Sequence, residues 1–180
     1  MKFSRLPLLA RAYVGLVMAA GLVLAVIAAT HGAFDRPLLL GGLVVASIVV
    51  HTVKIELAAS SSTLSLGYAV TFATLLILGG PASILTTMAG GWAQCTLNTK
   101  VQSPWYQTVF SISALLLSME SAALTLAWTG GHALNGPADI VIPSVMGSAF
   151  AYFTVNSLLM AIVIGLTVIQ FRWIERRVHY

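Results

Sequence analysis

The chain has 180 residues, of which 58% are hydrophobic and only 8% are charged; its formal net charge is +4 and its mean hydropathy is +0.94. A soluble domain carries about 25% charged residues, so this composition excludes a water-soluble globule. The basic residues are scattered singly rather than clustered among aromatic residues, which argues against a nucleic-acid partner.

Six apolar runs follow one another along the chain, and a membrane span needs about 20 such residues. The first run comes after Lys2 and Arg5, as in a signal peptide. Its uncharged stretch, residues 12–34, is longer than the roughly 7–15 residues of a signal hydrophobic region, so we expect a retained first helix. The predicted spans are residues 13–30, 38–53, 64–78, 82–97, 105–128 and 142–170.

Short polar or glycine-rich segments separate these runs. The sequence Gly79-Gly80-Pro81 predicts a tight turn, because glycine adopts unusual backbone angles and proline cannot continue a preceding helix. The spans on either side of this turn are rich in small residues, which let helix backbones approach closely in lipid. We therefore expect this pair of helices to lie inside the bundle.

The positions of the basic residues predict the topology, because Lys and Arg accumulate in cytoplasmic segments. If six spans cross the membrane in turn, the two chain ends and every second connecting segment lie on the same side. Eight of the nine basic residues fall in these segments, and Arg36 alone falls in a segment on the opposite side. The eight are Lys2, Arg5, Arg11, Lys54, Lys100, Arg172, Arg176 and Arg177. The expected fold is a single-domain, all-α, polytopic bundle of six transmembrane helices with both termini cytoplasmic, in which Arg172, Arg176 and Arg177 anchor the tail at the lipid surface.

Three stretches of the chain resemble a known family. Residues 65–73 (SLGYAVTFA) precede the Gly-Gly-Pro turn and the run AGG at 89–91, and residues 151–159 read AYFTVNSLL. These stretches look like the N-terminal membrane domain found before HD-GYP and GGDEF output domains in bacterial signalling proteins. That family, the vitamin-uptake-like sensor domains, is similar to the six-helix substrate-binding components of vitamin transporters. The resemblance covers residues 6–167 and implies a bacterial inner-membrane protein.

The chain departs from the family pattern after its last predicted span. A catalytic output domain normally follows in that family, whereas this sequence reaches Tyr180 without an HD pair or a GGDEF motif. The expectation is that the domain either acts on a separate partner or serves as a building block of a larger complex.

Glu120 is the sharpest candidate for a functional residue. It lies within the fifth predicted span among apolar neighbours, and an ionisable group there costs about 2.5–3.5 kcal/mol on insertion scales. Ser113 lies seven residues earlier on the same helix face. In a functional reading, Glu120 contacts a ligand, carries a proton or forms a hydrogen bond between subunits. In a structural reading, it is a neutral carboxyl group hydrogen-bonded within the bundle.

Asn156 and Tyr68 are the next polar candidates. Asn156 falls in the middle of the sixth predicted span, where a buried amide either links helices or contacts a ligand. Tyr68 and Thr71 on the third span could pair with Asn156 or Glu120, or simply pack.

Metal, cofactor and catalytic motifs are not evident in the sequence. Its four histidines lack the i, i+4 spacing of a helical metal site, and the single cysteine, Cys95, is most simply a packing residue. No nucleophile–base arrangement, phosphate loop or HExxH motif occurs, so we expect neither enzyme activity, a cofactor nor a metal site.

Three functions remain open at this level. The favoured one is a non-catalytic accessory subunit of a larger membrane complex, for which a respiratory or photosynthetic complex would be a natural host. The alternatives are a small-molecule binding or uptake component, with a pocket near the outer face that uses Tyr68, Glu120 and Asn156, and a sensor that acts on a separate cytoplasmic partner. A binder needs a cavity with converging polar groups, whereas a subunit needs an extended apolar face.

Overall fold

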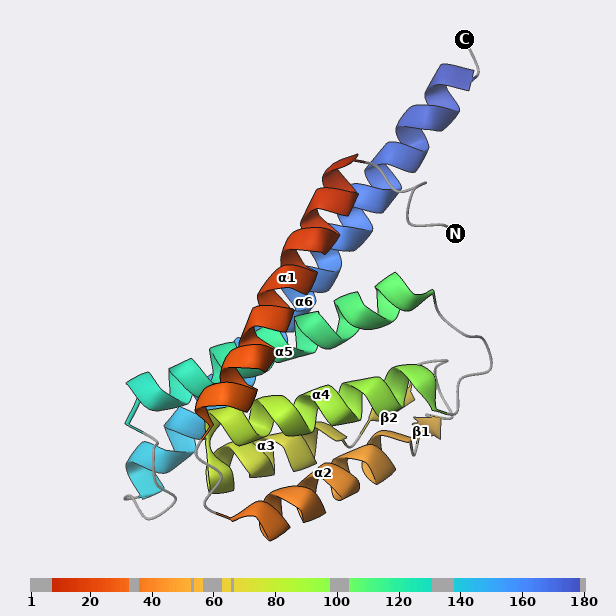
Figure 1. Cartoon of the computed structure of the whole chain (residues 1–180). Helices are drawn as coiled ribbons and strands as arrows, with labels where there is room; N and C mark the ends of the chain where they lie inside the picture. Colours follow the sequence, from red (N-terminus) through yellow and green to blue (C-terminus); the bar gives the residue numbers. More distant parts are fainter. Residues whose placement is uncertain are drawn as a thin grey trace.

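The computed structural model describes residues 8–32, 36–52, 54–56, 63–65, 67–97, 104–130 and 138–178. These residues form six α-helices and one pair of short antiparallel strands (Figure 1). In chain order they are α1 (Leu8–His31), α2 (Pro37–Thr52), β1 (Lys54–Glu56), β2 (Thr63–Ser65), α3 (Gly67–Leu78), α4 (Gly80–Thr96), α5 (Trp105–Trp128) and α6 (Ala138–Val178). The predicted all-α class is confirmed.

Three of the helices are long and apolar enough to cross a membrane. They are α1, α5 and the part of α6 over Val141–Thr167, whereas α2 and α3 are apolar but shorter. At 1.5 Å per residue, the 12 residues of α3 cover only about 18 Å of a hydrocarbon core about 30 Å thick. The three long helices agree with a membrane location, and the count of six crossings stays a prediction.

Four predicted boundaries differ from the structure by three residues or more. Helix α1 begins at Leu8 instead of residue 13, and α6 begins at Ala138 instead of residue 142. Residues 64 and 65, predicted to open the third span, lie in β2, where Leu64 pairs with Ile55 of β1. A short apolar run in a sequence does not by itself distinguish a strand from a helix. Here the backbone N–H and C=O groups of β2 form their hydrogen bonds with β1 instead of within a helix. At the other end of the chain, α6 continues to Val178, so the basic tail is helical; the side chains of Arg172, Arg176 and Arg177 lie outside the described residues.

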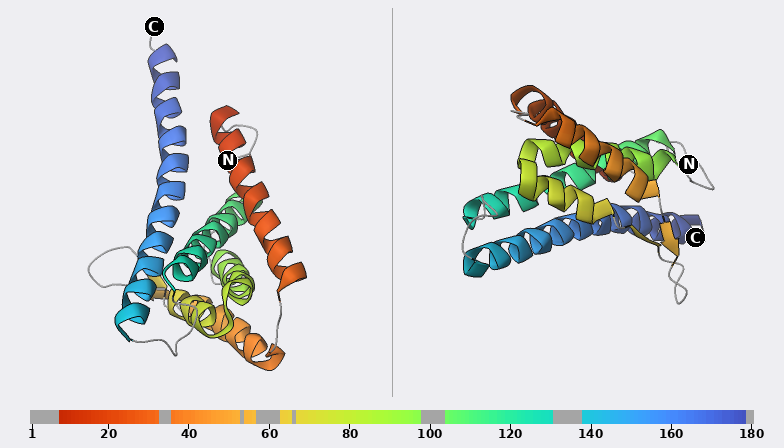
Figure 2. Two further views of the ribbon diagram at one scale, coloured as in Figure 1. Left: turned by 90° about the vertical axis from the view of Figure 1, so that its left-hand side faces the viewer. Right: turned by 90° about the horizontal axis from the view of Figure 1, so that it is seen from below.

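The interior of the bundle is built from α4 and α5. Helix α4 packs against α1, α2, α3 and α5, and α5 packs against α1, α4 and α6 (Figure 2). The buried positions of α4 are mostly small, including Ala82, Ser83, Gly90 and Ala93, which explains how so many neighbours fit around it. Of the two helices expected inside the bundle, α4 lies there, whereas α3 packs mainly on α2 and α4 and lies at the edge.

Helix α1 approaches α5 unusually closely at one glycine. A Cβ atom built on Gly21 would lie 2.5 Å from Ser113 Cβ and 2.7 Å from Ser113 Cα, so only glycine fits there. Ser113 is buried in this crossing. Ser113 therefore acts as a packing residue between α1 and α5.

The helix ends gather into two groups on opposite sides of the molecule. The C-terminal ends of α1, α3 and α5 and the N-terminal ends of α2, α4 and α6 lie at the lower left of Figure 1. The opposite helix ends lie toward the right and the top, with the β1–β2 pair among them. We call these two groups the turn end and the terminal end of the bundle.

Candidate functional site

A cavity of about 350 Å³ lies at the turn end of the bundle. Its wall comes from α1, from the α3–α4 turn and from the C-terminal half of α5, and it is partly open. Gly79 in this turn has φ +87°, a left-handed conformation that favours glycine and lets α4 reverse directly onto α3. The wall is made of aliphatic side chains, three glycine or proline positions and two ionisable side chains, His31 and Glu120.

Glu120 projects from α5 into this wall with apolar neighbours on all contributing helices. It is half-buried, and within the described part of the chain no hydrogen bond or ion pair engages its carboxylate. A carboxylate at an apolar cavity wall is stabilised by a cation or a hydrogen-bond donor that comes beside it. The cavity beside it supplies the space for that partner.

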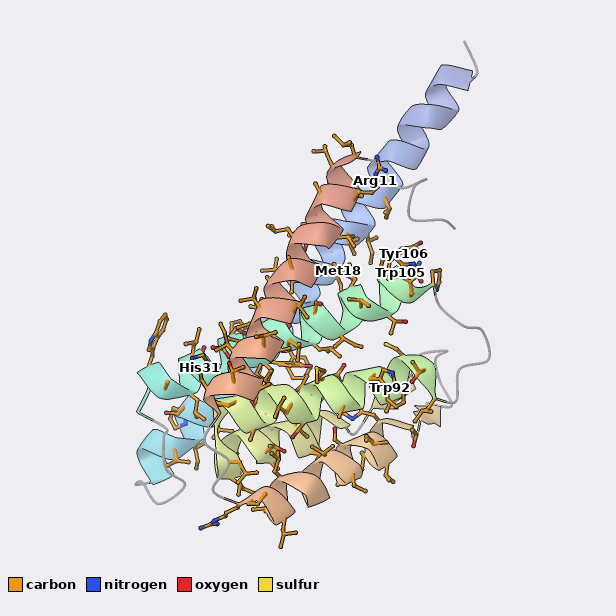
Figure 3. All side chains as sticks on the ribbon, in the orientation of Figure 1. Arg11, Met18, His31, Trp92, Trp105 and Tyr106 are labelled. Carbon is orange, nitrogen blue, oxygen red and sulfur yellow. The ribbon has the colours of Figure 1, made fainter. Side chains whose placement is uncertain are left out.

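His31 stands at the last turn of α1, on the rim of the same cavity (Figure 3). Its Nδ1 lies 2.8 Å from Thr30 Oγ1, and that hydroxyl donates to the Val26 carbonyl at 2.8 Å. The ring of His31 is exposed and is held against Thr30 by this contact.

The other predicted residues do not reach the cavity. Tyr68, Asn156 and Ser113 are absent from its wall, so the predicted convergence of Tyr68, Glu120 and Asn156 does not occur. The reason is the crossing of the helices: α6 packs on α5, and Tyr68 faces α6 instead, where its ring meets Tyr152 at 5.5 Å and Phe153 at 6.2 Å.

Tyr68 belongs to an aromatic cluster between α3 and α6, and Asn156 lies one turn beyond this cluster on α6. Tyr152 is the centre of this cluster, 1% exposed and in edge contact with Tyr68, Phe72 and Phe153. Asn156 follows Tyr152 by one helical turn on α6, and its buried Oδ1 has no hydrogen-bond partner. The buried Tyr152 hydroxyl forms no hydrogen bond of good geometry, but its polar neighbour is the side chain of Tyr68. Sequence reasoning missed Tyr152, although its i, i+4 spacing from Asn156 could have indicated it.

His51 is a second histidine, whose burial was not predicted from the sequence. It is 2% exposed at the end of α2, and its Nδ1 lies 2.8 Å from the Ser47 carbonyl oxygen. A Cβ atom on Gly90 would lie 2.6 Å from its Cε1 and Nδ1, and one on Gly67 would collide with the same two atoms and with Nε2. The ring therefore fills a slot between two helix backbones, which is a packing role.

No metal site emerges from the residues that the structure describes, since no three His, Cys, Asp or Glu side chains gather there. The possible chemistry of the cavity is binding through one carboxylate and one imidazole.

The comparisons with known proteins add no relative. No family model, no curated protein and no solved structure matches this chain. The resemblance to sensor membrane domains accordingly stays a prediction.

Proposed function

We propose that this chain is a non-catalytic, multi-pass protein of the bacterial inner membrane that binds a small amphipathic cation in the cavity beside Glu120. The topology within this proposal is six membrane helices with both termini cytoplasmic. It is supported by the alternation of helix ends between the turn end and the terminal end, and by the excess of Lys and Arg in segments of the terminal end.

The unpaired carboxylate of Glu120 is the single observation that carries the binding proposal. A cavity of about 350 Å³ lies within the range of small-molecule sites, roughly 300–1,000 Å³. Its aliphatic wall favours an apolar body, and one anionic group beside that wall favours one positive charge on the ligand. At the rim, the exposed imidazole of His31 adds a second polar group that the ligand can contact.

Binding of matched amine and neutral compounds tests this proposal. A panel of small aromatic and aliphatic amines, such as tryptamine, is compared with uncharged counterparts, such as 3-ethylindole, on the full chain in mild detergent. A hydrogen bond to a charged group contributes about 1.5–3 kcal/mol, so Glu120→Gln should weaken amine binding by roughly 10- to 150-fold. The neighbouring Ser121→Ala variant is the matched control, because Ser121 bonds only to its own helix at Ser118.

Two results would overturn the binding proposal. In the first, no amine in the panel binds better than its neutral counterpart. In the second, the preference for the amine survives Glu120→Gln, which would mean that the carboxylate plays no part in recognition. Mass spectrometry of small molecules that co-purify from the native membrane identifies the natural ligand class independently.

An accessory subunit of a membrane complex is the second candidate function, and α6 favours it. Of residues 141–167, only Ser144, Ser148 and Tyr152 are buried inside the chain, and Phe150, Phe153 and Leu158 are exposed. Lipid or a partner helix must cover this apolar surface. Purification from native membranes in mild detergent distinguishes the two: a stoichiometric protein partner supports the subunit, and a protein that migrates alone opposes it.

A further inference from the structure

A second hollow lies at the terminal end of the bundle, remote from Glu120. It measures about 410 Å³ and runs between the N-terminal parts of α1 and α5 and the second half of α6. Its wall is mainly apolar, with Val14, Phe110 and Val163 contributed by three different helices. A groove of this kind between membrane helices opens toward the lipid and accepts a flexible apolar chain.

The rim of this groove carries the groups that are typical of a lipid headgroup region. Tyr106 and Gln107 of α5 line the groove, and although Tyr106 is buried, the neighbouring Trp105 is 66% exposed. Amphipathic aromatic rings of this kind concentrate at membrane–water interfaces. The groove therefore has an apolar interior and an interfacial edge, as an acyl chain with its headgroup requires.

Arg11 supplies positive charge next to the groove. It is not itself a lining residue, but it precedes the lining residue Val14 by one helical turn on the same face of α1. Figure 3 shows it near the N-terminal end of α1. Arg11 is half-buried, and no carboxylate among the described residues pairs with it. Beyond the groove, residues 168–178 of α6 contain three arginines and one glutamate.

We infer that this groove binds an anionic phospholipid of the cytoplasmic leaflet, with an acyl chain between α1, α5 and α6 and the phosphate at Arg11. The charge of the rim selects this occupant, because basic pockets between helices on the cytoplasmic side bind anionic headgroups. Arginine matches a phosphate with two parallel N–H···O hydrogen bonds, which a neutral rim could not offer. A helix of another protein would fill the apolar part but would leave Arg11 without an anion.

Lipid binding to the full chain in detergent tests the inference. Phosphatidylglycerol is compared with phosphatidylcholine of the same acyl chains, and binding is measured by native mass spectrometry and by the shift in melting temperature. Phosphatidylglycerol should bind at least about tenfold more tightly, and Arg11→Gln should remove most of that preference. Arg36→Gln, at the turn end of the bundle, is the matched charge control and should retain it.

Two further variants separate lipid binding from folding. Arg11→Lys keeps the charge and should restore part of the preference for phosphatidylglycerol. Val163→Phe narrows the groove and should weaken binding of both lipids. Equal binding of both lipids by the unmodified chain would overturn the inference. So would an equal loss of preference in Arg11→Gln and Arg36→Gln, or a protein helix found in the groove by cross-linking.

Discussion

The crossing of α1 and α5 gives the sharpest test of the packing. In Gly21→Ala, the new Cβ would lie within 2.5–2.7 Å of three Ser113 atoms, including its Cα, so the two backbones must separate. Overpacking of this kind typically costs about 1–3 kcal/mol. Gly15 lies on the same helix with no atom within 4 Å of such a Cβ, so Gly15→Ala is the matched control.

Both variants gain the same intrinsic helix propensity, up to about 1 kcal/mol for glycine to alanine. Their difference therefore isolates the cost of the contact, and we expect Gly21→Ala to be less stable than Gly15→Ala by about 1–3 kcal/mol. Reversible unfolding in mixed detergent, followed by tryptophan fluorescence, measures this difference. Ser113→Gly in the Gly21→Ala background should recover only part of it, because Ser113 Cα stays in place. Equal stability of the two alanine variants would refute the close approach.

Three further predictions address the rest of the interior. Gly90→Ala should destabilise the fold by about 1–3 kcal/mol, because its Cβ would meet the buried His51 ring. Gly42→Ala on α2 places its Cβ in open space and should not destabilise the fold, so the melting temperatures of the two variants test the prediction. Tyr152→Phe removes a buried hydroxyl that forms no hydrogen bond of good geometry beside Tyr68, so the unfolding free energy should fall by less than about 0.5 kcal/mol, and a larger loss would contradict this reading. Tyr13→Phe removes a 3.1 Å hydrogen bond to the α6 backbone and should cost about 0.5–1.5 kcal/mol in the same unfolding assay.

The helices and their order could be predicted from the sequence because each signal is local. Apolar runs bounded by charged, glycine or proline residues define a span without reference to the rest of the chain. The Gly79-Gly80-Pro81 turn was predicted in this way, and α4 begins at Gly80. The start of α3 was not, because β2 forms only by pairing with β1, which precedes it by several residues.

The sites depended on tertiary structure. From the sequence alone, Glu120 stands out because a carboxylate in an apolar run is costly, and the basic residues indicate which helix ends share a side. Which polar groups meet is decided by how the helices cross. That crossing places Glu120 with His31 around a cavity, turns Tyr68 and Asn156 toward Tyr152, and encloses His51 between two glycines. Hydropathy along a chain fixes which residues leave water, whereas the rotation and crossing of packed helices fix which of them face one another.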